Sequence, residues 1–200
     1  MIVAESGDYH GYLSGGCLEQ TIVLAAQEAI GENKNRLVRY GKGSPYFDVR
    51  LPCGSGLDVY FDCRIAPATI TQMLEFRRAR TPFALNVNLT TGESRTETAD
   101  EPGARSMRTG DAFRQVYTPR PRMVLLGTGP SVAAIQKLAS ASGVETAVWA
   151  ADTATRCTLD AQSIAHYDTP EPPDAIFSML DRFTAAVIAF HEHDREPALV

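Results

Sequence analysis

Apolar residues recur at helical spacing near the start of the chain. The positions that share this spacing are Leu18, Ile22, Ala25, Ala26 and Ile30. Intervals of three and four residues place side chains on one face of an α-helix. Gly15 and Gly16 come just before the run and Gly31 ends it. Because glycine is a poor helix former, the pattern predicts an amphipathic helix that begins at residue 18 and stops at Gly31.

Short β-rich runs bounded by glycine and proline follow this helix, as is typical of strands. They cover residues 36–40, 47–51 and 57–61. Pro67 then suits the first turn of a helix that carries Ile70, Met73 and Leu74.

A further strand is predicted over residues 83–89, where apolar residues alternate with smaller or polar ones. Thr91-Gly92 predicts a hairpin turn, with a return strand over residues 94–98. The polar stretch over residues 100–111 has almost no apolar side chain and predicts a surface loop.

An uninterrupted apolar run, Met123 to Leu126, opens the second half of the chain. Such a run is typical of a parallel strand that is buried on both faces. Predicted helices at 131–142 and 175–180 alternate with predicted strands at 146–150 and 184–190. This βαβ alternation indicates a Rossmann-like domain with a parallel sheet. The expected fold class is α/β, with one domain over residues 1–118 and the Rossmann-like domain over residues 119–200.

The composition narrows the classes of function. The chain has 200 residues, of which 44% are hydrophobic, enough for a real core. The net charge is -5, whereas proteins that bind nucleic acid usually have a basic surface for the phosphate backbone, so we expect no nucleic-acid partner. No segment reaches the roughly 20 apolar residues that span a bilayer, and the first residues do not resemble a signal peptide. We therefore expect a cytoplasmic protein without a membrane contact.

Two of the four cysteines lie in glycine-containing turns, and we expect all four to be reduced. Cys17 stands at the start of the first predicted helix, where the helix dipole can convert a thiol into a thiolate that binds metal or carries sulfur. Cys53 and Gly54 lie in a turn whose N–H groups are open to an anion or cofactor. A buried small hydrophobe at Cys17 and a bare turn at Cys53 are the alternatives. No CxxC pair occurs, so we expect no structural zinc.

Gly127 and Gly129 lie where a predicted strand turns into a helix, and the free N–H groups of that helix could hold a pyrophosphate. Val132 replaces the third glycine of a dinucleotide fingerprint, and Asp152 only approximately supplies its acidic residue. A simple tight turn is the alternative. His191 follows the last predicted strand and should face the same crevice, unless it belongs to a solvated loop.

Four motifs follow one another along the chain: Ser14-Gly15-Gly16-Cys17-Leu18-Glu19, Leu51-Pro52-Cys53-Gly54, Pro121-Arg122-Met123-Val124-Leu125-Leu126-Gly127-Thr128-Gly129 and Thr184-Ala185-Ala186-Val187-Ile188-Ala189-Phe190-His191. In this order and spacing they resemble the xanthine dehydrogenase accessory protein family (XdhC/CoxI type). Ser55 stands where the family usually has a glycine. The resemblance also implies that family members continue beyond residue 200, so we expect a fragment whose second domain is incomplete.

The resemblance implies a maturation factor, more a chaperone than a catalyst. Such a protein binds molybdenum cofactor (molybdopterin), assists its sulfuration and inserts it into a xanthine dehydrogenase-like molybdenum hydroxylase. The implied partners are the hydroxylase apoenzyme and a cysteine desulfurase. The residues carried over to cofactor binding are Ser14, Gly15, Gly16, Cys17, Cys53, Gly54, Gly127, Gly129 and His191.

Two other functions stay open. An NAD(P)-binding oxidoreductase would use the Gly127–Gly129 turn, with His191 as acid or base. A structural adaptor between sulfurase and hydroxylase would not need either Cys17 or Cys53. An exposed strand or an unpaired half-domain would also allow a homodimer.

Overall fold

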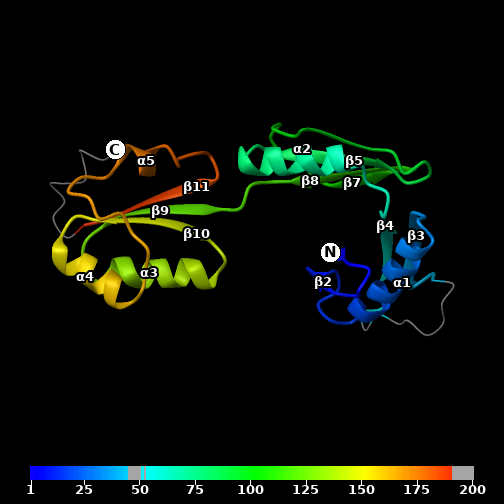
Figure 1. The fold of residues 1–200 in the computed structure, drawn as a ribbon, viewed down its shortest axis with the longest axis horizontal. Coiled ribbons are helices and arrows are strands. Elements are labelled where there is room, and N and C mark those ends of the chain that lie inside the picture. Colours follow the sequence, from blue (N-terminus) through cyan, green and yellow to red (C-terminus); the bar gives the residue numbers. More distant parts are fainter. Residues whose placement is uncertain (45–50, 52, 191–200) are drawn as a thin grey trace. The chain divides into compact units, whose positions relative to one another are not determined.

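The structure is a computed structural model that describes residues 1–44, 51 and 53–190. The chain divides into two compact units, Met1–Thr118 and Pro119–Val200 (Figure 1). Within the described ranges, no helix has both the length and the apolar character needed to cross a membrane.

The first half of the unit Met1–Thr118 packs one helix against short strand pairs. Its elements are β1 (Ile2–Val3), β2 (Tyr9–His10), α1 (Glu19–Gly31), β3 (Arg36–Gly41) and β4 (Gly56–Phe61). β1 pairs with β2 and β3 pairs with β4, both antiparallel. Buried side chains of α1, the residue before it and the β3–β4 pair form a core: Leu18, Ile22, Ala26, Ala29, Tyr40, Val59 and Phe61.

The predictions for this segment hold where the structure describes it. The helix and the strands at 36–40 and 57–61 are confirmed. Most of the strand predicted at 47–51 lies outside the described residues, and Leu51 itself is not in a strand.

The second half of this unit is a four-stranded antiparallel sheet with a helix on one face (Figure 1). It comprises α2 (Pro67–Arg78), β5 (Phe83–Asn88), β6 (Ser94–Thr98), β7 (Met107–Thr109) and β8 (Ala112–Tyr117), with the strand order β6-β5-β8-β7. Phe83 lies between Phe76 of α2 and Tyr117 of β8, with ring centroids 5.3 and 4.9 Å away. Side chains alternate along a strand, so Phe83, Leu85 and Val87 face α2 while Asn86 and Asn88 face away from it.

The loop predicted over residues 100–111 is wrong in part. Met107–Thr109 forms β7 and Ala112–Tyr117 forms β8, a strand that the sequence did not indicate. No residue of either strand is fully buried, so the two strands lack the apolar signal of a buried strand. The helix at Pro67 is confirmed, but two of its predicted apolar positions, Ile70 and Leu74, are exposed.

The unit Pro119–Val200 has a parallel sheet between helices. Its elements are β9 (Arg122–Gly127), α3 (Pro130–Ala141), β10 (Glu145–Ala150), α4 (Thr153–Ala161), α5 (Asp174–Phe177) and β11 (Thr184–Ala189). β9 is central, with β10 and β11 parallel to it on either side. Figure 1 shows α3 and α4 on one face and α5 on the other. The sheet has a hydrophobic core on each face, and alternate residues of β9 belong to different cores. Leu125 packs with Val132 and Leu159 in one core. Val124 and Leu126 pack with Ile176 and Trp149 in the other.

The expected parallel sheet is confirmed, and so is the mixed α/β character of the chain. The predicted second helix is wrong in length, because α5 makes a single turn over Asp174–Phe177. α4 was not predicted. Its sequence is rich in threonine, and of its two buried residues, Thr155 and Leu159, only Leu159 is a large apolar side chain.

Candidate functional site

The carboxylate of Glu19 organises the loop that leads into α1. Its Oε1 accepts the backbone N–H groups of Leu13 and Ser14, at 3.0 and 2.8 Å. Its Oε2 accepts the Ser14 hydroxyl at 2.7 Å and the N–H groups of Gly16 and Leu18 at 2.8 and 3.2 Å. The Ser14 hydroxyl oxygen in turn accepts the Leu18 N–H at 2.8 Å. One side chain therefore fixes the loop from Leu13 to Leu18.

Glu19 is a buried carboxylate, since the residue is only 3% exposed. Hydrogen bonds from the Ser14 backbone and hydroxyl outweigh the effect of burial and lower the pKa of Glu19 to about 2. The group is therefore ionised at neutral pH. The sequence analysis placed Glu19 inside the family motif but gave it no role. The signal that could have indicated one is an acidic residue at the first turn of a helix, preceded by several N–H groups in a glycine loop.

This loop holds Cys17 at the surface. Gly15 and Gly16 have φ values of 69° and 110°, in the region that favours glycine. An added Cβ at either glycine would meet nothing within 4 Å, so the space beside the loop is open. Cys17 is exposed and lies just before Leu18, the N-cap residue of α1. The predicted position of the thiol is correct, and the alternative of a buried cysteine is wrong.

Cys53 is also exposed and has a hydroxyl partner. Its Sγ lies 2.8 Å from Oγ of Ser55. Hydrogen bonds from the Ser55 side chain and backbone lower the pKa of the Cys53 thiol below its ordinary value. Gly54 makes the turn with a φ of 69°, and its N–H donates to the Leu51 carbonyl at 2.9 Å. Ser55, the residue that departs from the family pattern, therefore supports a thiolate at Cys53.

The other cysteines have different surroundings. Cys63 is half-buried, and its Sγ lies 3.4 Å from both the Ala29 carbonyl and Oδ1 of Asn35. Cys157 is exposed on α4. No disulfide forms, and all four thiols are free.

The N–H groups at the Gly127–Gly129 turn are occupied within the protein. Thr128 N–H donates to the Ala189 carbonyl at 2.9 Å, and Gly129 N–H donates to Oγ1 of Thr155 at 2.6 Å. The next residue, Pro130, has no N–H. A Cβ on Gly127 would lie 2.3 Å from the Ala189 carbonyl oxygen, so this glycine lets β11 pack closely against β9. Such a turn offers few donors to a pyrophosphate.

Asp152 belongs to the same network. Its Oδ1 accepts the Thr155 N–H at 2.8 Å, which caps α4, and its Oδ2 accepts the Thr155 hydroxyl at 2.6 Å. Burial alone would raise the pKa of Asp152, but the two hydrogen bonds from Thr155 outweigh it and lower the pKa. The carboxylate is thus used inside the protein, where a dinucleotide site would need it for a ribose.

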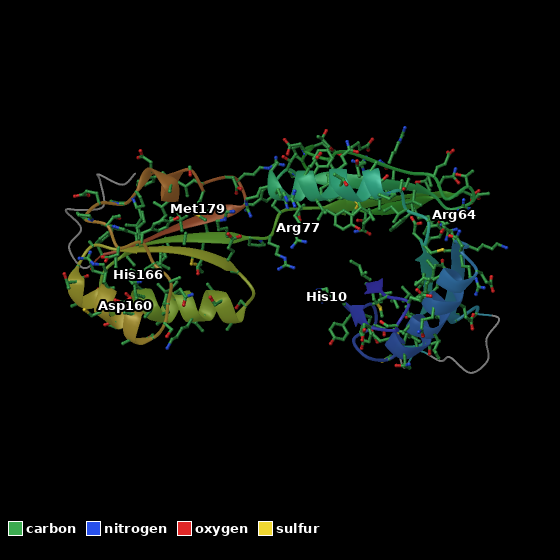
Figure 2. The ribbon with its side chains drawn as sticks, viewed as in Figure 1. His10, Arg64, Arg77, Asp160, His166 and Met179 are labelled. Atoms are coloured by element: carbon green, nitrogen blue, oxygen red, sulfur yellow. The ribbon has the colours of Figure 1, made fainter. Side chains whose placement is uncertain are left out.

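The remaining candidate residues do not form a metal centre in the part of the chain that is described. No group of three His, Cys, Asp or Glu side chains suited to a metal ion occurs there. The two described histidines, His10 and His166, lie in different units (Figure 2). His191 lies outside the described residues.

The fold and the site define a two-unit α/β protein that presents single thiols on loops. Residues 1–41 match the XdhC and CoxI family. The molybdenum cofactor insertion chaperone PaoD of Escherichia coli (strain K12) is 31% identical over 159 residues, which cover 74% of this chain and 46% of that protein. Both findings agree with the resemblance that the four motifs indicated: the chain is similar to the XdhC and CoxI family.

A solved structure shows the same fold. A crystal structure of a xanthine dehydrogenase from Bacillus halodurans matches with a TM-score of 0.68 and 19% identity, covering 98% of this chain and 66% of that one. At this identity the likeness bears on the fold alone. The chain also spans about half of its curated relative, 46% of the length of PaoD.

Proposed function

We propose that the protein is a maturation factor that binds molybdenum cofactor and assists its sulfuration and insertion into a xanthine dehydrogenase-like hydroxylase. The observation that carries this proposal is the loop held by Glu19, which keeps Cys17 exposed beside open space. The relative PaoD is named as a molybdenum cofactor insertion chaperone, which supports the same role here. In this proposal residues 1–118 form the family-specific domain and residues 119–200 a Rossmann-like domain.

The donor set fits the cofactor. A molybdenum cofactor supplies a metal–sulfur centre, which soft thiolate ligands suit. Cys17 and Cys53 are exposed single thiols, and a hydroxyl at 2.8 Å supports the thiolate form of Cys53. A single thiol holds a metal centre less tightly than a full set of protein ligands does. A protein that hands the cofactor to another protein needs such weaker binding. We assign Cys17 and Cys53 to contact with the cofactor or its sulfur, and Ser14, Gly15, Gly16 and Gly54 to shaping the two loops.

The proposal that Gly127 and Gly129 bind the phosphate of the cofactor has weaker support. The Gly129 N–H already donates to Thr155, so a phosphate would have to replace that bond. His191 remains a predicted contact. A hydroxylase apoenzyme and a cysteine desulfurase are the proposed partners, the cytoplasm is the proposed location, and a homodimer is a proposed assembly.

Co-purification with pterin tests the proposal. The protein is expressed with an intact cofactor pathway, and bound pterin is measured by fluorescence after oxidation. We expect pterin in the wild type and its loss in Cys17→Ser or Cys53→Ser. Cys157→Ser is the matched control, since it removes an exposed thiol that stands in no glycine turn. Equal pterin in all four proteins, or pterin in none, would contradict the proposal.

A further inference from the structure

The turn that carries Cys53 is bordered by a lysine of the neighbouring strand end. In the β3–β4 pair, Gly41 lies opposite Gly56, and the Lys42 N–H donates to the Ser55 carbonyl at 2.9 Å. Ser55 is also the residue whose hydroxyl contacts the Cys53 thiol. Lys42 is therefore bonded directly to the residue that supports the Cys53 thiolate.

Arg39 of β3 is held at the same end of this strand pair. Its Nε donates to the Lys42 carbonyl at 2.9 Å. A Cβ added at Gly43 would lie 3.1 Å from Nε of Arg39, and one added at Gly56 would lie 2.6 Å from its Nη2. The two glycines therefore leave the space that the guanidinium occupies. The side chain is nonetheless 43% exposed, so it can reach a ligand.

One carboxylate fixes two arginines at this place. Asp58 lies directly opposite Arg39, and its Oδ1 accepts Nη1 of that arginine at 2.9 Å. Its Oδ2 pairs with Nη1 of Arg108 on β7 at 3.3 Å. The Nη2 atoms of both arginines have no hydrogen-bond partner in the part of the chain that the structure describes. Each guanidinium is thus held in position and keeps donors for a ligand.

Positive charge exceeds negative charge at this end of the β3–β4 pair. Arg39, Lys42 and Arg108 bring three positive charges, against the one carboxylate of Asp58. Lys42 is exposed and forms no ion pair among the described residues. If Asp111, three residues after Arg108, is counted as well, the cations still outnumber the carboxylates. An anion is therefore attracted here, although the chain as a whole is acidic.

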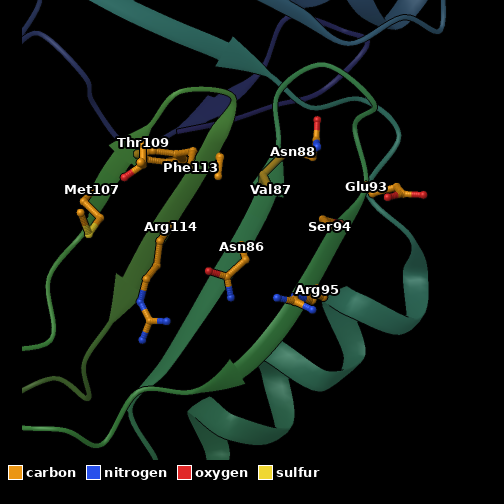
Figure 3. Close-up of a pocket in the computed structure, with 11 residues that line it drawn as sticks. Asn86, Val87, Asn88, Glu93, Ser94, Arg95, Met107, Thr109, Phe113 and Arg114 are labelled. Atoms are coloured by element: carbon orange, nitrogen blue, oxygen red, sulfur yellow. The ribbon is translucent and has the colours of Figure 1, made fainter.

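The hollow on the sheet face opposite α2 has no such excess (Figure 3). Arg95 and Arg114 lie there on either side of Asn86. Arg114 is already paired with Glu97 and Glu101, and Nδ2 of Asn86 is buried. That face therefore offers an anion less than the Cys53 turn does.

We propose that Arg39, Lys42 and Arg108 bind the phosphate group of the molybdenum cofactor beside the Cys53 turn. This inference rests on the proposed function and names the residues that recognise the anionic part of the ligand. A phosphate monoester carries roughly two negative charges at neutral pH. Guanidinium groups donate to phosphate oxygens in a fixed fork, and an ammonium group adds a point charge. The site supplies the free donors that the Gly127–Gly129 turn lacks.

Phenyl phosphate is the probe for the test, with phenol as its uncharged counterpart. The full chain is labelled with ¹⁵N, and the backbone amide signals of Gly43 and Gly56 are followed during titration. We expect saturable shifts with phenyl phosphate at about millimolar affinity, weaker at high salt, and no saturation with phenol. No saturable shift of these two glycines with phenyl phosphate, or equal binding of phenol, would overturn the proposal.

Matched lysine variants separate this site from general charge attraction. Lys42→Gln keeps the backbone bond to Ser55 and should weaken phenyl phosphate binding about threefold, because one exposed charge interaction is lost. Lys137→Gln removes an exposed lysine of the unit Pro119–Val200 and should leave binding unchanged. Equal binding by the two variants would overturn the proposal.

Pterin co-purification then separates this inference from the proposed function. Pterin that is reduced in Lys42→Gln, but not in Lys137→Gln, would support binding of the cofactor's phosphate at this site. Equal pterin in the wild type and both variants would overturn it. Pterin absent even from the wild type would contradict the proposed function, whereas saturable binding of phenyl phosphate would still support a phosphate site.

Discussion

Replacing Thr155 by valine should open the turn at Gly129. Valine has the same shape as threonine but lacks the hydroxyl, which accepts the Gly129 N–H at 2.6 Å and donates to Asp152 at 2.6 Å. Thr155 is only 4% exposed, so water has little access to replace these bonds. Leaving a half-buried donor without a partner costs about 1–3 kcal/mol. We expect Thr155→Val to lower the free energy of unfolding of this unit by about 2 kcal/mol.

Trp149 makes this measurement selective. It is the single tryptophan of the chain and is buried in β10, so its fluorescence reports unfolding of the unit Pro119–Val200 in urea. We expect a lower urea midpoint with an unchanged slope, because the exposed area on unfolding stays the same. Amide hydrogen exchange at Gly129 should also become faster.

Thr158→Val is the control for this change. Thr158 lies on the same helix, and its hydroxyl donates to the Ala154 carbonyl at 3.0 Å without serving another element. Its replacement should change stability by less than about 0.5 kcal/mol. If Thr155→Val had the same urea midpoint as Thr158→Val, and Gly129 exchanged as slowly as in the wild type, the Thr155 hydroxyl would not be what closes this turn.

Three further outcomes are expected. The pKa of Glu19 is lowered to about 2 from an ordinary 4.5, so the stability that its carboxylate gives the loop is complete above pH 4.5 and is lost as the pH falls through 2. A ¹³C titration of this carboxyl with a midpoint above 4 would refute this. Ser55→Ala should raise the pKa of Cys53 and slow its alkylation at pH 8, with Cys157 as internal reference, and an unchanged rate would speak against the hydroxyl contact. Gly127→Ala should destabilise its unit by about 1–3 kcal/mol, because the new Cβ meets a carbonyl oxygen; urea unfolding like that of the wild type would show that the backbone adjusts freely.

Much of the chain's local structure was predictable from apolar spacing. The sequences of α1 and β9 have regular apolar patterns that end at a glycine, and the bounds of both elements were predicted within a residue or two. α4 was missed because Leu159 is its only large apolar buried side chain, and β8 was missed because none of its residues is fully buried.

The sequence by itself indicated the resemblance to the XdhC and CoxI family and placed two thiols in glycine-containing turns, because the motifs around Cys17 and Cys53 are local runs of residues. Only the tertiary structure decided what surrounds them. It directed five donors onto Glu19, used the Gly129 N–H for Thr155, and aligned Asn86 with two arginines from other strands. These contacts depend on strand register and on the paths of loops. Sequence spacing does not predict strand register or loop path, because the residues that meet lie on separate strands and helices or on a loop that folds back.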